Sequence, residues 1–254
     1  MVKDLGLAGK RVVVSGAAGG LGRAFAEAFG AAGATVLAAD INDAGLEETV
    51  ALVKSAGGKG YSATVDVTEA ESCRALAGTA RSLMGGADVL VNNAALYAGL
   101  QRGPFEELDE AVWDKVMAVN VKGVWQMTRA FAPLLREAGG GSVVNVASAT
   151  VFSGSPHWMH YVASKGAVIA MTRVMAKEMG TDNIRANVIA PGFTLTEASF
   201  GHMADARSYG ADRASLKRNA EVDDITGGAL YLASPLSAFT TGQTLVIDGG
   251  KQFI

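Results

Sequence analysis

Tyr161 and Lys165 are the residues whose types and spacing most directly suggest chemistry. They stand four positions apart in a segment that reads as helix, and at about 3.6 residues per turn both side chains emerge on one face. A lysine ammonium beside a phenol stabilises the phenolate and lowers the tyrosine pKa towards working pH. The pair predicts a tyrosine that acts as acid or base, although the same two residues also meet by chance on amphipathic helices.

A glycine-rich turn, SGAAGGLG from Ser15 to Gly22, lies between a short apolar strand and an alanine-rich helix. Gly16, Gly20 and Gly22 give the turn conformational freedom and let backbone approach a ligand closely. A helix that begins at such a turn offers free N–H groups and positive dipole to a pyrophosphate. The segment predicts a dinucleotide-binding turn, with a tight turn that binds nothing as the alternative.

Asp40 follows the second apolar strand, 18 positions beyond Gly22 (40 − 22). A carboxylate at this place can accept hydrogen bonds from the adenosine ribose hydroxyls and repel a 2′-phosphate. The next residues, Ile41, Asn42 and Asp43, supply no cation to bind that phosphate. The sequence therefore favours NAD and disfavours NADP, unless Asp40 only caps the next helix.

Short apolar segments alternate with amphipathic segments along the whole chain, and no linker or tandem repeat interrupts them. Strands are predicted at residues 10–15, 34–39, 59–65, 87–91, 142–147, 184–190 and 244–247. Helices are predicted at residues 23–32, 44–56, 68–84, 105–119, 121–137, 159–179 and 225–233. This pattern indicates an α/β fold, a three-layer doubly wound structure with a parallel seven-stranded sheet, as a single domain over residues 1–254.

Polar residues follow several of these strands, where open α/β sheets bind ligands. Asp66 suits either the adenine amino group or a helix cap, and Asn93 suits either a ligand or an ordinary turn. Ser148 ends a strand, and the loop after it can fold the serine over the helix of Tyr161. Asn120 lies in an apolar helical stretch, where its amide needs a local partner or a ligand.

Composition excludes several classes of protein. A formal charge of −3 gives no reason to expect nucleic acid or an acidic membrane as partner. Cys73 is the single cysteine, residues 1–10 lack the apolar core of a signal peptide, and no apolar run reaches the length of a bilayer span. The three histidines lack the spacing of zinc ligands, so no metal is expected. We expect a soluble cytoplasmic protein.

Two further segments carry predictions. The helix at residues 159–179 is apolar almost all round, which indicates burial against the sheet on one side and against another subunit on the other. Residues 193–219 have mixed charge and no firm period, so we expect a mobile loop or short helices over the active face.

Taken together, these motifs resemble the short-chain dehydrogenase/reductase family over essentially the whole chain. Asn92-Asn93-Ala94-Ala95 is similar to its Asn-Asn-Ala-Gly motif, with Ala95 in place of glycine, and Ser15 stands where threonine is commoner. The resemblance implies a Rossmann fold, hydride transfer between an alcohol carbon and the nicotinamide, and a homotetramer. It also implies a catalytic set of Asn120, Ser148, Tyr161 and Lys165, in which Asn120 holds a water.

The resemblance extends to the residues around each ligand. The expected cofactor-binding residues are Ser15, Gly16, Gly20, Leu21, Gly22, Asp40, Ile41, Asp66, Val67, Asn93, Ala94, Ala95, Tyr161, Lys165, Pro191, Gly192, Phe193 and Thr194. The expected substrate-binding residues are Ser148, Val151, Trp158 and Tyr161, with Tyr97, Phe152, His202 and Tyr209 as further candidates near the nicotinamide.

These pocket residues are mostly apolar, which favours a hydrophobic or aryl secondary alcohol or its ketone. The alternatives are an NADPH-dependent ketoreductase for 3-oxoacyl carrier substrates, a sugar or polyol dehydrogenase, and a nucleotide-binding scaffold without activity.

Overall fold

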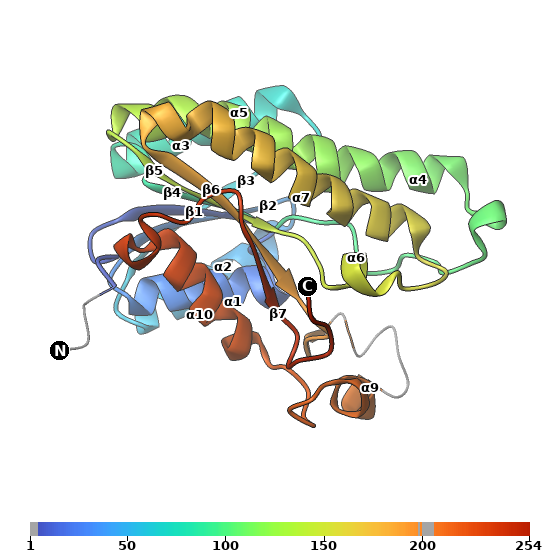
Figure 1. Ribbon diagram of the computed structural model, residues 1–254. Coiled ribbons are helices and arrows are strands. Elements are labelled where there is room, and N and C mark those ends of the chain that lie inside the picture. The colour runs from blue at the N-terminus through green and yellow to red at the C-terminus, as the bar shows by residue number, and fades with distance from the viewer. Residues whose placement is uncertain (1–4, 198, 200–205) are drawn as a thin grey trace.

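The computed structural model describes residues 5–197, 199 and 206–254. These residues form a parallel sheet of seven strands between two layers of helices (Figure 1). The strand order is β3-β2-β1-β4-β5-β6-β7, so the chain winds outward first from β1 and then from β4. The predicted doubly wound α/β fold is confirmed.

The strands occupy short stretches of apolar sequence. They are β1 (Arg11–Ser15), β2 (Thr35–Asp40), β3 (Lys59–Thr64), β4 (Val89–Asn92), β5 (Gly141–Val146), β6 (Ile184–Pro191) and β7 (Thr244–Ile247). Central strands are continuous apolar runs because helices cover both of their faces; Val12, Val13 and Val14 of β1 are all fully buried. β3, at the edge, instead has Gly60 as its single buried position, and its other residues are exposed or half-buried.

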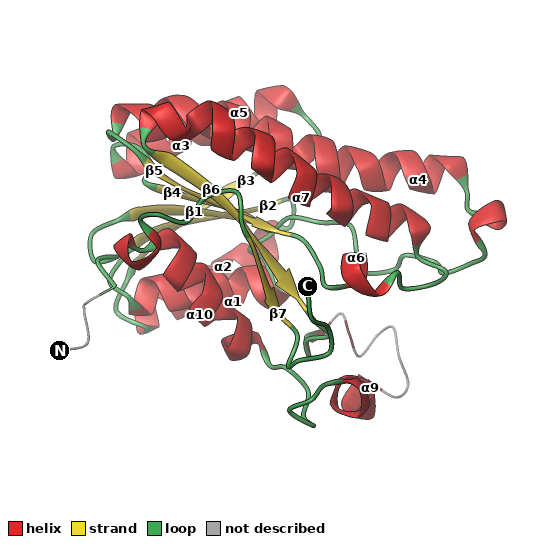
Figure 2. Ribbon diagram, in the orientation of Figure 1, coloured by secondary structure: helices red, strands yellow, loops and turns green. Residues whose placement is uncertain are grey.

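The helices divide between the two faces of the sheet (Figure 2). The main helices are α1 (Gly20–Ala31), α2 (Asp43–Ser55), α3 (Ala70–Met84), α4 (Glu110–Met117), α5 (Gly123–Glu137), α6 (Thr150–Ser153), α7 (Met159–Met179), α9 (Ala206–Arg213) and α10 (Val222–Ala233). One layer contains α1, α2 and α10, and the other contains α3, α4, α5 and α7. Two large apolar clusters fill the spaces between these layers and the sheet.

The functional end of the fold is the edge where the parallel strands finish. There α6 and α9 lie beyond the sheet (Figure 1). The winding direction reverses between β1 and β4, so the turns that follow these two strands diverge and leave a crevice.

The segment around Asn120 differs from the prediction of a helix at residues 105–119. Phe105–Glu107 forms only a 3-10 turn, and α4 begins at Glu110. The side chain of Asp109 caps α4 by accepting a hydrogen bond from the N–H of Val112 at 3.0 Å. A π-helical turn at Ala118–Lys122 joins α4 to α5 without a break, and Asn120 lies within this turn.

The segment at residues 193–219, expected to form a mobile loop or short helices, contains a short helix. After β6 ends at Pro191, α9 occupies Ala206–Arg213. Residues 198 and 200–205 of this segment, including His202, lie outside the described residues. The short helix α6 after Ser148 was not predicted.

Candidate active site

A cavity of about 820 Å³ lies at the carboxyl edge of the sheet. Fourteen of the expected site residues line it: Gly16, Gly20, Leu21, Asp40, Asn93, Ala95, Ser148, Trp158, Tyr161, Lys165, Pro191, Gly192, Phe193 and Thr194. They come from turns that are far apart in sequence, and the parallel sheet brings them together because its strands all end at the same edge.

The glycine turn packs directly on the loop that follows β4. Gly16 has a φ of +67°, and a Cβ there would lie 2.6 Å from the Cα of Ala94. Asn93 secures the contact, because its Nδ2 donates to the carbonyls of Ser15 at 3.1 Å and Gly16 at 2.9 Å. Only glycine fits this position of the turn.

Ser15 joins β1 to β4 through its hydroxyl. The Oγ donates to the carbonyl of Val91 at 3.3 Å and accepts from the N–H groups of Asn93 and Ala94, both at 3.2 Å. The side chain is 1% exposed. Ser15 therefore holds the turn in place and does not itself line the cavity.

Asp40 lies at the glycine end of the cavity, and its carboxylate is held in a defined orientation. One oxygen accepts from the N–H of Ala18 at 3.0 Å and the other from the N–H of Asn42 at 3.1 Å. The nearby Arg23 forms an ion pair with Glu48 at 2.9 Å, so its charge is already matched. This end of the cavity presents a carboxylate towards any bound ligand.

The residues at this end fit a dinucleotide. Helix α1 begins at Gly20 with no side-chain cap, and Gly19 to Leu21 line the cavity. A Cβ on Gly19 would meet nothing within 4 Å. Uncapped N–H groups at an open helix N-terminus suit a pyrophosphate, and the fixed carboxylate of Asp40 suits the ribose hydroxyls.

Tyr161 is buried in the wall of the cavity, 6% exposed, with its ring centroid 5.1 Å from that of Trp158. Burial raises the pKa of Tyr161 above its ordinary value, Tyr97 raises it further, and a hydrogen bond with the Ser148 side chain opposes both. The expected lowering of this pKa by Lys165 is wrong for the protein alone. The ammonium lies 5.8 Å from the centroid of the phenol ring, and desolvation by burial is the largest cause of the shift.

Lys165 is directed to the backbone at the end of β5. Its Nζ donates to the carbonyl of Val146 at 2.8 Å, and the residue is 3% exposed. Burial lowers the pKa of Lys165 to about 8. The ammonium still borders the cavity and lies on the same helical face as Tyr161, as the four-residue spacing predicted.

Ser148 lies just beyond β5 and is oriented by its neighbour Thr150. The Ser148 Oγ accepts from the Thr150 hydroxyl at 3.0 Å and from the Thr150 N–H at 3.3 Å. With its acceptor capacity used in this way, the serine hydroxyl is free to donate its proton towards Tyr161 or a ligand oxygen. In the sequence the only signal for Thr150 is a second hydroxyl two residues after the serine, and no role for it was predicted.

Asn120 is fully buried behind the cavity. Its Oδ1 accepts from the N–H of Leu96 at 2.7 Å, and its Nδ2 donates to the carbonyl of Leu96 at 3.2 Å and to the Oγ of Ser164 at 3.1 Å. Ser164 in turn donates to the carbonyl of Tyr161 at 2.7 Å. The amide is satisfied within the chain and links the loop after β4 to α7.

Eight expected site residues are not among the described residues that line the cavity. They are Ser15, Gly22, Ile41, Asp66, Val67, Ala94, Asn120 and Val151. The Asp66 carboxylate accepts from the N–H and hydroxyl of Thr68, at 2.8 and 2.7 Å, within the turn before α3. The N-cap of α3 is Glu69, so Asp66 does not cap that helix. Val151 packs with the apolar cluster on β6 and α7, and Ile41 is 69% exposed.

Some lining residues had no signal in the sequence because they come from loops without a regular pattern. The main ones are Arg102, Thr150, Pro156, Glu197 and Lys251. Tyr97 and Tyr209, the further candidates, also line the cavity, as do His157 and Thr196. The part of the chain that the structure describes contains no group of three His, Cys, Asp or Glu side chains placed to hold a metal ion. Within the same residues, no helix has both the length and the hydropathy that crossing a bilayer requires.

The fold and this site define an oxidoreductase of the dinucleotide-binding α/β class. A family profile described as Enoyl-(Acyl carrier protein) reductase matches residues 16–252. The chain belongs to the short-chain dehydrogenase/reductase family, and it acts on CH–OH groups or the corresponding ketones with a nicotinamide cofactor. The predicted family and reaction class are confirmed.

Similar proteins cover almost the whole chain. The 3-oxoacyl-acyl-carrier-protein reductase FabG of Thermotoga maritima is 36% identical over 244 residues, which is 96% of this chain and 98% of that protein. The D-threitol dehydrogenase of Mycolicibacterium smegmatis is 36% identical over 250 residues, covering 97% and 94%. The solved structure of a 7α-hydroxysteroid dehydrogenase with NADH and 7-oxo glycochenodeoxycholic acid is 31% identical, with a TM-score of 0.92 and 98% of this chain covered.

Proposed function

We propose that the chain is an NAD-dependent dehydrogenase that interconverts a hydrophobic or aryl secondary alcohol and its ketone. The observation that carries this proposal is the position of the Tyr161 phenol, buried in the cavity wall between Ser148 and the aromatic side chain of Trp158. The nicotinamide cofactor, when bound, accepts or supplies the hydride.

The chain's own residues manage the proton. Tyr161 takes the proton of the substrate hydroxyl during oxidation and returns it during reduction. Ser148 donates a hydrogen bond to the developing oxyanion. Lys165 supplies positive charge beside the phenol, and Asn120 positions Tyr161 through Ser164.

The preference for NAD rests on Asp40. Its carboxylate is held by the N–H groups of Ala18 and Asn42, so it cannot turn away from a 2′-phosphate without losing two hydrogen bonds. Arg23, the arginine that directly follows the glycine turn, is already paired with Glu48.

The preference for an apolar substrate rests on the aromatic side chains beside Tyr161. Tyr97, Trp158, Phe193 and Tyr209 all line the cavity. A 3-oxoacyl carrier reductase with NADPH and a polyol dehydrogenase are the second candidates, because relatives with those names are each 36% identical. Turnover with NAD against NADP, and with aryl alcohols against polyols, separates the three.

A homotetramer, a single-domain organisation and a cytoplasmic location are also part of the proposal. For the tetramer, the support is apolar exposure on the outer helices: Trp125 of α5 is 46% exposed and Val174 of α7 is 54% exposed.

The decisive test is Tyr161→Phe, which removes the hydroxyl and keeps the ring. We expect kcat to fall by about a hundredfold to ten-thousandfold, the range for loss of a general acid–base group, while NADH binding measured by fluorescence is retained. Tyr61→Phe, on β3 outside the cavity, is the matched control and should keep turnover. A Tyr161→Phe enzyme with normal kcat would refute the assigned role.

A further inference from the structure

The aromatic side chains beside Tyr161 form a compact group on the substrate side of the cavity. The Tyr97 ring centroid lies 5.4 Å from that of Trp158 and 5.5 Å from that of Tyr161. These rings give the reacting end of a substrate an apolar surface to lie against.

A guanidinium adjoins this group. The Arg102 Cζ lies 4.0 Å from the centroid of the Trp158 ring, and Arg102 lines the cavity. The Trp158 ring centroid in turn lies 5.1 Å from that of Tyr161, so Arg102 contacts the aromatic group at Trp158 and not at the phenol itself.

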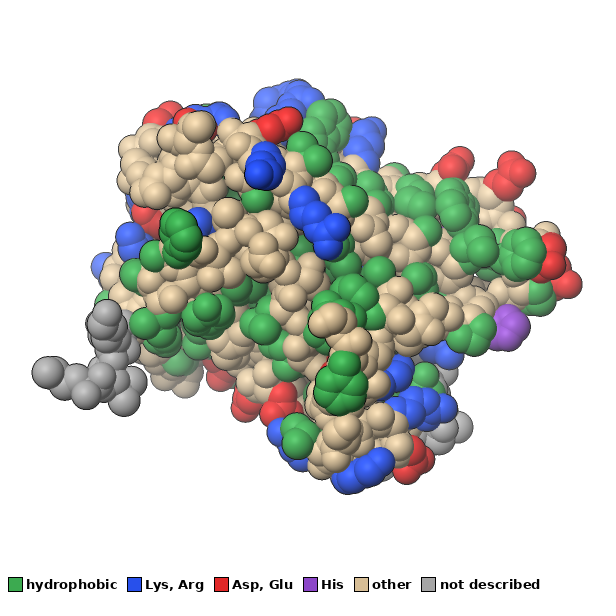
Figure 3. All heavy atoms as spheres, in the orientation of Figure 1, with side chains coloured by type: hydrophobic (Ala, Val, Ile, Leu, Met, Phe, Trp, Pro, Cys, Tyr) green, Lys and Arg blue, Asp and Glu red, His purple; other side chains and the backbone are tan. Residues whose placement is uncertain are grey.

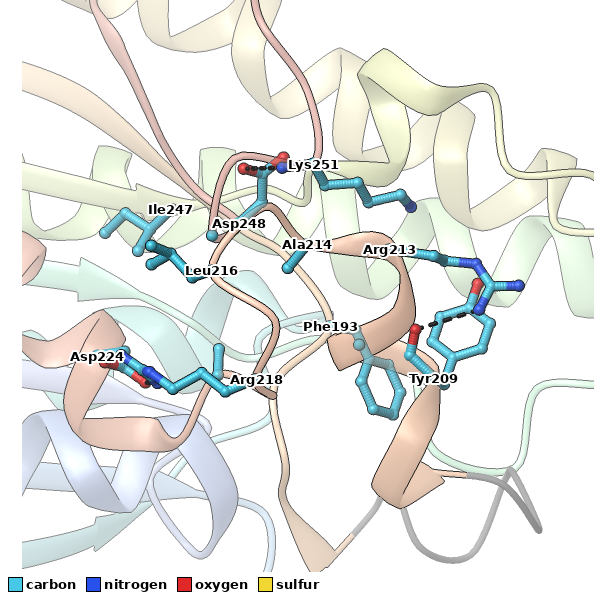
Figure 4. A pocket seen from close by; sticks show the side chains of 13 residues that line it. Phe193, Tyr209, Arg213, Ala214, Leu216, Arg218, Asp224, Ile247, Asp248 and Lys251 are labelled. Carbon is cyan, nitrogen blue, oxygen red and sulfur yellow. Dashed lines mark hydrogen bonds and ion pairs between the residues drawn. The ribbon is translucent and has the colours of Figure 1, made fainter.

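Arg213 and Lys251 are among the cations that line a side pocket of about 120 Å³, which shares Phe193, Tyr209 and Lys251 with the main cavity (Figure 4). Arg213 stacks on the Tyr209 ring, with its Cζ 3.8 Å from the centroid, and Lys251 lines both spaces. In Figure 4 the side chains of Lys251 and Arg213 extend in the same direction. The surface view also has several Lys and Arg side chains around α9 (Figure 3).

Arg102 and Lys251 line the same cavity, together with Tyr97 and Tyr209. Burial raises the pKa of Tyr97, Arg102 lowers it and Tyr209 raises it, so both residues lie within electrostatic reach of this phenol. Arg213 lines the side pocket, where it stacks on Tyr209.

The acids nearby do not neutralise these cations. Asp224 is paired with Arg218 at 2.5 Å, and Asp248 accepts from the backbone N–H groups of Gly250 and Lys251. Among the residues that the structure describes, neither Arg102 nor Lys251 has a carboxylate within 4.0 Å.

The cavity itself contains two carboxylates, Asp40 at the glycine turn and Glu197. Asp40 belongs to the cofactor end, which leaves Glu197 as the acid opposite Arg102 and Lys251 among the described lining residues. Arg102 and Lys251 therefore give this part of the cavity an excess of positive charge. No described carboxylate pairs with either side chain, and a neutral aryl substrate would not balance their charge.

We propose that the natural substrate carries a carboxylate remote from the reacting carbon, joined to it by an apolar or aryl body. Arg102 and Lys251 bind this carboxylate, and the rings of Tyr97 and Trp158 hold the body between them and Tyr161. The inference rests on the proposed function, since the aromatic group positions the alcohol or ketone at Tyr161.

The test compares 4-(1-hydroxyethyl)benzoate with 4-(1-hydroxyethyl)benzamide, which differ in charge and little in shape. We expect kcat/KM with NAD to favour the benzoate by about tenfold or more, because a hydrogen bond to a charged group is stronger than one between neutral groups. Arg102→Met and Lys251→Met should each reduce this ratio several-fold, mainly through the KM of the benzoate.

Lys217→Met is the matched control. Lys217 is an exposed cation that follows α9, it is not among the described residues that line either space, and its Nζ is directed to the carbonyl of Asp212 at 3.4 Å. The benzoate-to-benzamide ratio should be the same in this variant as in the natural enzyme.

The outcomes separate the two proposals. Turnover of both alcohols at equal kcat/KM overturns the carboxylate site and leaves the dehydrogenase function standing. Absence of turnover for every alcohol and ketone refutes the function, and calorimetric binding of 4-acetylbenzoate against 4-acetylbenzamide then decides on the carboxylate. Tighter binding of the acid that is lost in Arg102→Met supports the site, and equal binding of the two ketones overturns it.

Discussion

The ammonium of Lys165 donates a hydrogen bond to the carbonyl of Val146 at 2.8 Å, and this contact joins the second turn of α7 to the last residue of β5. Because both groups are shielded from water, the charged form of Lys165 is disfavoured and its pKa falls from 10.5 to about 8. The same helix carries Tyr161, so this contact sets where the phenol lies relative to the sheet.

The lowered pKa of Lys165 predicts a pH-dependent stability. Between pH 8 and 10.5, the two values of this pKa, the unfolded chain keeps a proton that the folded chain has released. The free energy of unfolding should therefore rise with pH across that window, by up to about 2 kcal/mol. The cost of the buried charge is fully present below about pH 8.

Urea unfolding of the natural protein and of Lys165→Met checks this prediction. The variant has no charge at this position and should lack the rise. Measurements stop below about pH 10, because the raised pKa of Tyr161 has the opposite sign: stability falls once the unfolded tyrosine ionises. Identical slopes in the two proteins would contradict the assignment to Lys165.

Asp40→Asn should weaken the discrimination between NAD and NADP. The substitution removes the charge and keeps an amide oxygen as acceptor for an N–H group of Ala18 or Asn42. We expect the ratio of kcat/KM for NAD to that for NADP to fall by about tenfold or more, because a repulsion worth more than about 1.4 kcal/mol is lost.

Asp43→Asn is the control for that experiment. Asp43 is a carboxylate three residues further on, in the first turn of α2, where it accepts a hydrogen bond from the Thr64 hydroxyl. The cofactor ratio should stay unchanged there. An equal shift in both variants would mean that net charge, and not the position of Asp40, sets the preference.

Asn120→Ala should reduce both stability and turnover. It leaves the N–H and carbonyl of Leu96 and the Oγ of Ser164 without their partner in a buried site, at a cost of about 2–4 kcal/mol in the free energy of unfolding. If Asn120 positions Tyr161, kcat falls more than KM rises. Ser164→Ala removes only part of the network and should lose about half as much stability.

Two glycines of the cofactor turn should respond to alanine in different ways. At Gly22 a Cβ would lie 1.9 Å from the carbonyl oxygen of Gly16, so Gly22→Ala must displace the turn and lower Tm by several degrees. At Gly19 a Cβ meets nothing within 4 Å and the φ of −173° suits any residue. Gly19→Ala should keep Tm and weaken NADH binding, because the methyl group enters the cavity. Loss of Tm in both variants would contradict this distinction.

Local patterns in the sequence were sufficient for the fold and for the positions of the glycine turn and Asp40 at one end of the cavity. The apolar run of β1, the glycine turn and Asp40 lie within one strand–helix–strand unit, so their geometry follows from neighbours in the chain. The four-residue spacing of Tyr161 and Lys165 likewise requires only an α-helix.

The roles of several strand-end residues could not be read in the same way. For Asp66 and Asn93 the sequence allowed two roles each. In the structure Thr68 donates to the Asp66 carboxylate within a turn before α3, while Asn93 both secures the glycine turn and lines the cavity. The direction of the Tyr161 pKa shift was predicted wrongly. Burial is its largest cause, and burial depends on residues that are distant in the sequence.

The sequence by itself thus determined the α/β alternation, the glycine turn and the placing of Tyr161 and Lys165 on one helical face, because each depends on dihedral preferences and periodicity within a short segment. The tertiary structure alone decided which side chains border the cavity. Arg102 and Lys251 stand 149 positions apart (251 − 102) in loops without a pattern, and they line one cavity because seven parallel strands end at the same edge. The pKa values of these side chains depend on burial and on contacts between residues distant in the sequence. Both exist only once the sheet has formed.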